Sequence, residues 1–202
     1  ADNAMKAGPI NPRPGEFNFG PADAFVAFGE AHGMFIVGHT LVWHNQTPPW
    51  FFQDESGKTN APAAQIERMR SHIETVAGRY KGRVHAWDVV NEVIDNDGSY
   101  RPTPWVNAVG NGDELVKAAF RFASQYAPGT ELYYNDFNAW RPAKRDGIVR
   151  MVKMLKAEGI RIDGIGMQGH WGLNYPKSEY IESAIDAFAA LGVKVMITEL
   201  DV

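Results

Sequence analysis

The sequence contains no cysteine, which excludes a disulfide framework and thiolate chemistry and leaves the redox compartment open. No apolar run approaches the roughly 20 residues that a membrane-spanning helix needs. The opening segment ADNAMKAGPI lacks the charged and apolar parts of a signal peptide. The formal charge of −4 comes from 20 basic and 24 acidic residues spread along the chain, without a basic block that could neutralise phosphates. We therefore expect neither nucleic acid nor a membrane as a partner.

Five short runs of apolar, β-branched and aromatic residues predict strands that are buried on both faces. They cover residues 34–42, 84–90, 131–137, 162–167 and 193–200. Between them lie segments with helical periodicity, over residues 21–32, 63–80, 113–125, 143–158 and 178–191. The 202 residues, of which 45% are hydrophobic, suffice for one substantial core, so we predict a single domain over residues 1–202.

This alternation predicts an α/β fold with parallel strands and crossover helices, either doubly wound or closed into a barrel. A doubly wound sheet concentrates its chemistry at one switch point and usually carries a glycine-rich phosphate turn, which this chain lacks. Polar or aromatic side chains instead follow every predicted strand: His39, Trp43 and His44, then Asn91 and Glu92, Asn135 and Asp136, Gln168 and His170, and Glu199 and Asp201. This distribution is typical of a barrel, in which all strand ends share one mouth, although five strands do not close an eight-stranded barrel.

Two glutamates at strand ends are candidate catalytic residues. Glu92 follows the apolar run in VHAWDVVNEV, and Glu199 follows the run in VKVMITELDV. Retaining cleavage of a glycosidic bond needs one protonated carboxyl that assists the departing oxygen and one carboxylate that attacks the anomeric carbon. Glu92 is the candidate general acid, and Glu199, beside Thr198 and Asp201, is the candidate nucleophile. Position alone is equally consistent with two surface charges at strand ends.

The segment GHTLVWHNQTPPW has residue types that suit hydrogen bonding to sugar hydroxyls and stacking of a sugar ring on indole. His39, His44 and His170 are equally consistent with buried, hydrogen-bonded core histidines. Three histidines near one mouth also raise the possibility of a metal site. Their spacing matches no helical HExxH pattern, and two carboxylates explain the chemistry without a metal, so we predict no metal and no cofactor.

Five motifs in this order, GHTLVWH, WDVVNE, YYNDFN, GMQGHW and ITELD, resemble the endo-β-1,4-xylanases of glycoside hydrolase family 10. The resemblance spans nearly all 202 residues. It implies a (β/α)8 TIM barrel that hydrolyses the xylan backbone with retention and needs no cofactor. It also implies that Glu92 is the acid/base and Glu199 the nucleophile.

The resemblance further implies a set of sugar contacts. Asn91 would bond the sugar 2-OH beside the nucleophile. On the non-reducing side of the cleaved bond the sugars would be held by Asn3, Lys6, His39 and Trp43, with Gln168 and His170 lining the same region. Tyr134 and Asn135 would contact the sugar on the leaving-group side.

The chain departs from the family pattern in two respects. Asp2 stands where the family usually has Glu, which shortens or removes one sugar contact. The sequence also resembles only the part of the barrel from the end of the second strand to the seventh, so we expect an incomplete barrel, a fragment with two apolar edges that is not necessarily active alone.

The expected partners are xylan and xylo-oligosaccharides, and the full-length enzyme is expected to be monomeric. Because polymeric xylan cannot enter a cell, we expect the enzyme to be secreted or extracytoplasmic. Two alternatives stay open: a non-catalytic polysaccharide-binding protein, and an enzyme that prefers cellulose, which differs from xylan by a hydroxymethyl group on each sugar.

Overall fold

The structure is built on one parallel sheet whose strand order follows the chain order. The computed structural model describes residues 3–201, so Asp2 lies outside the described residues. The strands are β1 (Val37–Val42), β2 (Ala86–Asn91), β3 (Glu131–Asp136), β4 (Gly164–Gln168) and β5 (Lys194–Thr198). Each pairs in parallel with the next, which places β1 and β5 at the two edges of the sheet.

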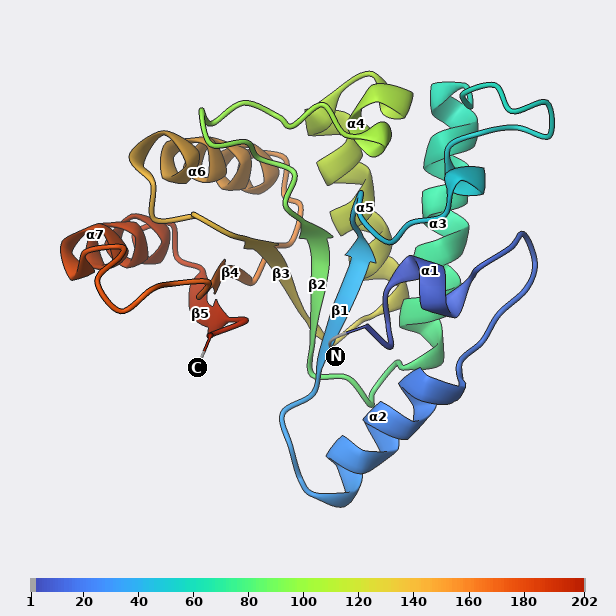
Figure 1. Cartoon of the computed structure of the whole chain (residues 1–202), viewed down its shortest axis with the longest axis horizontal. Coiled ribbons are helices and arrows are strands. Elements are labelled where there is room, and N and C mark those ends of the chain that lie inside the picture. The colour runs from blue at the N-terminus through green and yellow to red at the C-terminus, as the bar shows by residue number, and fades with distance from the viewer. Residues whose placement is uncertain (1–2, 202) are drawn as a thin grey trace.

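Helices lie between successive strands and surround one side of the sheet (Figure 1). The long helices are α2 (Gly20–Ala31), α3 (Pro62–Arg79), α5 (Gly112–Tyr126), α6 (Pro142–Ala157) and α7 (Ser178–Ala189). Three short elements were not predicted: α1 (Ala7–Ile10), the 3-10 turn η1 (Pro49–Phe51) and α4 (Pro104–Val109). Five sequential parallel strands with helices on the outside form part of a barrel wall, as the sequence predicts.

Local signals explain most helix boundaries. The side chain of Asn111 caps α5 by accepting hydrogen bonds from the backbone N–H groups of Asp113 and Glu114, at 2.9 and 3.3 Å. Gly159 and Gly192 follow the ends of α6 and α7 with φ of 65° and 68°, a backbone region in which glycine carries no steric penalty. The predicted stops at these two glycines agree with the structure.

The first strand begins later than the sequence predicts. β1 starts at Val37 instead of Met34, and the side chains of Met34 and Phe35 are 47% and 56% exposed. Apolar character at these two positions therefore does not indicate strand pairing. The backbone N–H of Ile36, the first buried residue of this segment, donates to the His85 ring instead, at 3.0 Å.

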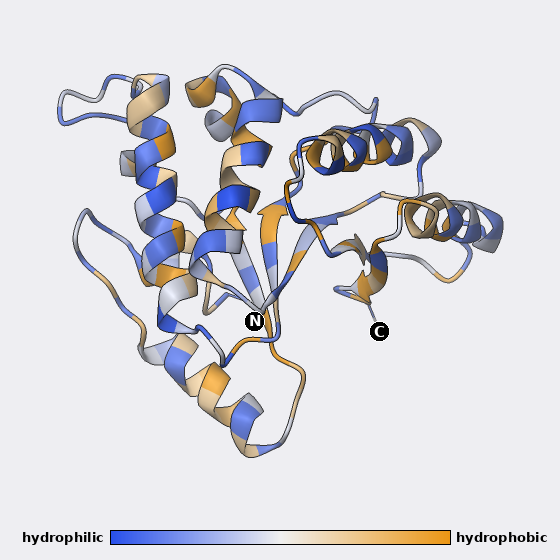
Figure 2. Ribbon diagram, turned by 180° about the vertical axis from the view of Figure 1, so that it is seen from behind, coloured by the Kyte–Doolittle hydropathy of each residue, from blue (hydrophilic) through white to orange (hydrophobic). Residues whose placement is uncertain are grey.

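The core lies between the sheet and the outer helices (Figure 2). Helix α5 contributes an apolar face that includes Leu115, Val116 and Phe120, all with no exposed surface. Glycines in the strands make room for large neighbours: a Cβ at Gly38 would lie 2.3 Å from the Trp87 ring. Such close approach of backbone and ring is expected in a close-packed core.

Within residues 3–201, no helix is both long enough and apolar enough to cross a membrane.

Candidate active site

Glu92 stands directly after β2, a strand with every residue buried. Its φ is 58°, in the left-handed region that residues with a Cβ rarely adopt. The backbone N–H of Glu92 donates to the carbonyl of Asn135 at 3.0 Å, which ties this turn to the end of β3. A strained backbone held by its surroundings is common at functional sites, because the strain fixes the direction of a side chain.

The carboxylate of Glu92 accepts two side-chain hydrogen bonds. One comes from the indole Nε1 of Trp43 at 3.0 Å and the other from the amide Nε2 of Gln168 at 3.2 Å. These donors come from the loop after β1 and from the end of β4. Half-buried His44 lies nearby, where burial lowers the pKa of its ring and the charge of Glu92 opposes that effect.

Glu199 stands directly after β5 with φ of 52°, so both candidate catalytic glutamates share the same strained geometry. Its Oε1 accepts from the amide Nδ2 of Asn135 at 2.7 Å, and its Oε2 lies 3.2 Å from Nε2 of His170. The Glu199 side chain is 33% exposed, so it is accessible from solvent while its oxygens are directed by two neighbours.

His170 bridges two acidic residues. Its Nδ1 lies 3.1 Å from Asp201, opposite the contact of Nε2 with Glu199. Partial burial lowers the pKa of His170, but the hydrogen bonds to Asp201 and Glu199 outweigh that effect and raise the pKa above its ordinary value. A protonated ring donates to both carboxylates and therefore directs the carboxylate of Glu199.

A chain of buried amides connects the two glutamates. The Asn91 amide lies 2.9 Å from that of Asn135 and 3.2 Å from that of Gln168. Asn135 contacts Glu199 and Gln168 contacts Glu92, so the two carboxylates are linked through Asn91 by side-chain contacts. The Asn135 amide is itself oriented because its Oδ1 accepts from Thr198 Oγ1 at 2.6 Å.

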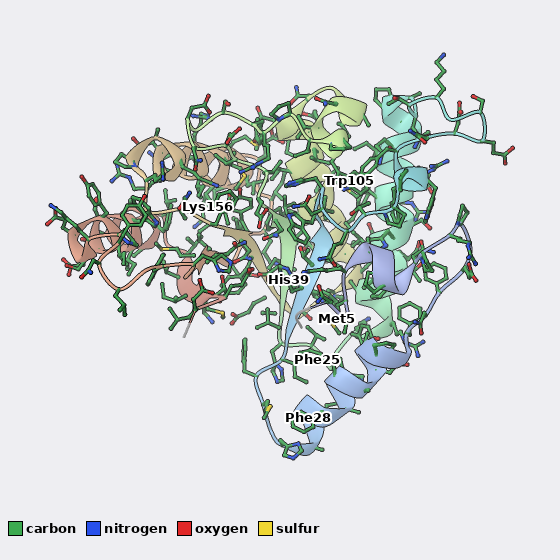
Figure 3. All side chains as sticks on the ribbon, viewed as in Figure 1. Met5, Phe25, Phe28, His39, Trp105 and Lys156 are labelled. Atoms are coloured by element: carbon green, nitrogen blue, oxygen red, sulfur yellow. The ribbon has the colours of Figure 1, made fainter. Side chains whose placement is uncertain are left out.

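Three of the residues predicted for the non-reducing side, Lys6, His39 and His170, line one cleft. This cleft of about 520 Å³ is lined by Lys6, His39, His170 and Glu199 among others. Lys6 Nζ donates to Asn3 Oδ1 at 3.0 Å and lies 4.8 Å from the Trp43 ring centroid. Figure 3 labels His39 on β1, in the middle of the structure, and His39 Nδ1 lies 2.9 Å from Asp88 Oδ2.

Two predicted sugar contacts do not agree with the structure. Tyr134 and Asn135 have no exposed surface, so neither side chain reaches the cleft surface on the leaving-group side. Consecutive strand residues point to opposite faces. Asn135 therefore points to the amide network, whereas Tyr134 points to the helix side and donates to Asp136 there. Asn91 and Gln168 are each 2% exposed and contact each other, and Gln168 also donates to Glu92.

The sequence analysis did not name Asp88 and named Thr198 and Asp201 only as neighbours of Glu199, whereas the structure gives all three an orienting contact in the site. Asp88 orients His39, Asp201 orients His170, and Thr198 orients Asn135. Asp88 carried a usable signal, because an acidic residue inside the apolar run of β2 is costly to bury without a partner. Within residues 3–201, no group of three or more His, Asp or Glu side chains has an arrangement that could hold a metal ion, and the three histidines considered above share no such geometry.

The β/α wall and the two carboxylates at strand ends define a barrel protein of the glycoside hydrolase class. Residues 1–202 match the model of glycosyl hydrolase family 10, and the chain belongs to this family.

Curated relatives include endo-1,4-beta-xylanase A of Xylanibacter ruminicola, which is 48% identical over 202 residues, covering 100% of this chain and 54% of that protein. Endo-1,4-beta-xylanase B of Paenibacillus barcinonensis is 45% identical, covering 100% of this chain and 60% of that protein. The chain thus spans a little over half the length of these relatives.

Among solved structures, a family 10 endoxylanase from a sugarcane soil metagenome superimposes with a TM-score of 0.96 at 46% identity, over 99% of this chain and 57% of that one. An intracellular xylanase of Thermoanaerobacterium saccharolyticum, a mutant in complex with xylotriose, gives a TM-score of 0.94 at 39% identity, over 100% of this chain and 64% of that one. The described strands accordingly form part of a (β/α)8 barrel, as the sequence predicts.

Proposed function

We propose that this chain carries the catalytic centre of an endo-β-1,4-xylanase that cleaves xylan with retention. The observation that carries the proposal is the pair Glu92 and Glu199, both at strand ends, both in strained backbone and joined by one buried amide network. Retaining hydrolysis needs two such carboxyls with different roles.

In the proposed first step, Glu92 donates its proton to the glycosidic oxygen as Glu199 attacks the anomeric carbon. The leaving sugar departs as an alcohol, and an ester forms between Glu199 and the remaining sugar. In the second step the Glu92 carboxylate removes a proton from water, whose oxygen attacks the same carbon, and Glu199 leaves as a carboxylate. His170 lies 3.2 Å from the Glu199 oxygen Oε2, so it would stabilise the carboxylate before attack and after release.

The differing contacts of the two glutamates support this assignment of roles. Glu199 contacts the amide N–H of Asn135 and the ring of His170, whose pKa is raised, so its two oxygens face donors that suit an attacking carboxylate. Glu92 accepts instead from an indole N–H and an amide N–H, both of them neutral donors.

The proposed substrates are xylan and xylo-oligosaccharides, supported by the relatives named as endo-1,4-beta-xylanases and by the relative in complex with xylotriose. Lys6 and His39, with Trp43 beside them, offer polar groups and an aromatic surface of the kind that binds sugar rings. We further propose that the full-length enzyme is secreted or extracytoplasmic, because polymeric xylan cannot cross a membrane. We also propose that it acts as a monomer.

The proposal is tested with the full natural chain that contains these residues. Replacing Glu199→Gln should abolish hydrolysis of xylan while binding of xylotriose persists, and Glu182→Gln, on the exposed surface of α7, should leave both unchanged. NMR of the first released sugar should show the β-anomer. Hydrolysis that persists in Glu199→Gln would refute the nucleophile assignment.

Two further outcomes would favour the alternatives. A wild-type chain that binds xylotriose without turning it over would support a binding protein. Faster cleavage of an aryl cellobioside than of the matching aryl xylobioside would instead identify cellulose as the preferred polymer.

A further inference from the structure

A buried cluster lies behind Glu92, on the helix side of the sheet. The hydroxyl of Tyr134 accepts a hydrogen bond from the backbone N–H of Ile94 at 3.0 Å and donates to Oδ2 of Asp136. Tyr134 and Asp136 have no exposed surface, so neither contact competes with water. Ile94 is two residues beyond Glu92, and Tyr134 therefore holds the segment that leads away from that glutamate.

A buried ion pair braces this tyrosine. Nζ of Lys144, on α6, lies 2.6 Å from Oδ1 of Asp136, and both side chains are completely buried. Burial raises the pKa of Asp136 to about 7, against the opposing effect of Lys144. Lys144 Nζ also lies 3.8 Å from the Phe137 ring centroid. Removing one partner of such a pair leaves an uncompensated charge in the core, so the pair resists any movement that would separate it.

The segment that these contacts hold is strained. Glu92 has a φ of 58°, a conformation that is unfavourable for a residue with a Cβ relative to the ordinary helical region. Three backbone anchors surround it: the Glu92 N–H donates to Asn135, the Val93 carbonyl accepts from Arg101, and the Ile94 N–H donates to Tyr134. The first two contacts are between backbone atoms, whereas the third is accepted by the Tyr134 side chain. Only this third contact can therefore be removed by one substitution.

We propose that Tyr134, braced by Asp136 and Lys144, is a positioning residue that aims the carboxyl of Glu92 at the departing oxygen. This inference rests on the proposed function. It assigns Tyr134, which does not reach the cleft surface, a role in proton transfer through Glu92. A displacement of about 1 Å of a group that takes part in the chemistry can cost on the order of 100-fold in rate.

The test compares leaving groups in Tyr134→Phe. Phenol is a poor leaving group that needs a proton from Glu92, whereas dinitrophenolate is a stable anion that departs without one. Because kcat/KM reports the steps up to departure of the leaving group, we expect it to fall about 10- to 100-fold for phenyl xylobioside and to change less than about twofold for dinitrophenyl xylobioside. Equal losses on both substrates would overturn the proposal, as would no loss on either.

Tyr133→Phe is the matched control. Tyr133 is also buried on β3, and its hydroxyl also donates to a carboxylate, that of Glu131 at 2.9 Å, near the opposite end of the strand. Both variants lose a buried hydroxyl, so both should lose stability in thermal unfolding. Only Tyr134→Phe should change the dependence of kcat/KM on the leaving group.

A double variant separates this proposal from the proposed function. Glu92→Ala alone should produce a larger version of the same leaving-group dependence, and adding Tyr134→Phe should cause no further loss, since Tyr134 acts through Glu92. Glu92→Ala without that dependence would refute the acid/base assignment itself. Suppose that Glu92→Ala shows the expected leaving-group dependence but that the double variant loses kcat/KM further. Those two results together would refute only the positioning role of Tyr134.

Discussion

His72 is predicted to make the protein lose stability as the pH falls. The residue lies on α3, 4% exposed, with its ring edge-on to Phe51 at 5.3 Å between centroids. Burial lowers the pKa of His72 from 6.5 to about 4, and an interaction with the Leu41 backbone opposes this effect only in part. The folded protein thus holds the ring neutral at a pH where the unfolded chain binds a proton.

The sign and size of this change in unfolding free energy follow from the linkage between proton binding and folding. Because the pKa is lower in the folded state, the contribution is fully present above pH 6.5 and is lost as the pH falls towards about 4. One pKa unit corresponds to about 1.4 kcal/mol, so the full loss is on the order of 3 kcal/mol. A loss of that size is a large fraction of the stability of an ordinary domain.

The assay is urea unfolding of the wild type and of His72→Leu at several pH values. The other titrating groups contribute equally to both proteins, so the difference in unfolding free energy isolates His72. We expect the variant to gain about 3 kcal/mol relative to the wild type between pH 7 and pH 4, and the difference to stay constant from pH 7 to pH 8. A difference that does not change with pH would refute the reasoning.

Three further predictions concern other parts of the structure. His170→Ala should destabilise most below pH 6.5 and progressively less as the pH rises through the raised pKa of this ring, as measured by thermal unfolding across pH. Gly38→Ala should lower the free energy of unfolding by about 1–3 kcal/mol, because a Cβ there would meet an indole ring at 2.3 Å. Gly78→Ala is the control: a Cβ there would have nothing within 4 Å, so this change should be neutral or stabilising. Equal losses for the two variants in chemical denaturation would contradict the packing argument. Lys144→Met should cost about 3–5 kcal/mol by leaving Asp136 unpaired, and replacing both residues with apolar ones should recover part of that loss.

The sequence predicts the five strands and the position of Glu92 and Glu199 because both depend on local patterns. A buried parallel strand is a short apolar run, and a polar residue directly after it faces the mouth. The contacts of these glutamates are non-local: Trp43 and Glu92 are far apart in the chain, and only the sheet brings them to 3.0 Å.

The error at Tyr134 has a specific physical cause. The motif YYNDFN contains residue types that suit sugar binding, but two consecutive strand residues cannot both face the mouth. Which one does so depends on the register of β3 against β2, in which Asn91 pairs with Asn135. That register is set by the packing of the whole sheet, and the motif alone does not contain it.

Gly166 shows that a position without a side chain can determine the geometry of a site. A Cβ at this residue of β4 would lie 2.3 Å from Oδ1 of Asn135 and 3.1 Å from the methyl group of Thr198. Even alanine there would displace the amide that contacts Glu199. A survey of this family for inactive variants should therefore include Gly166 among the residues that define the active site, although it offers a substrate no functional group.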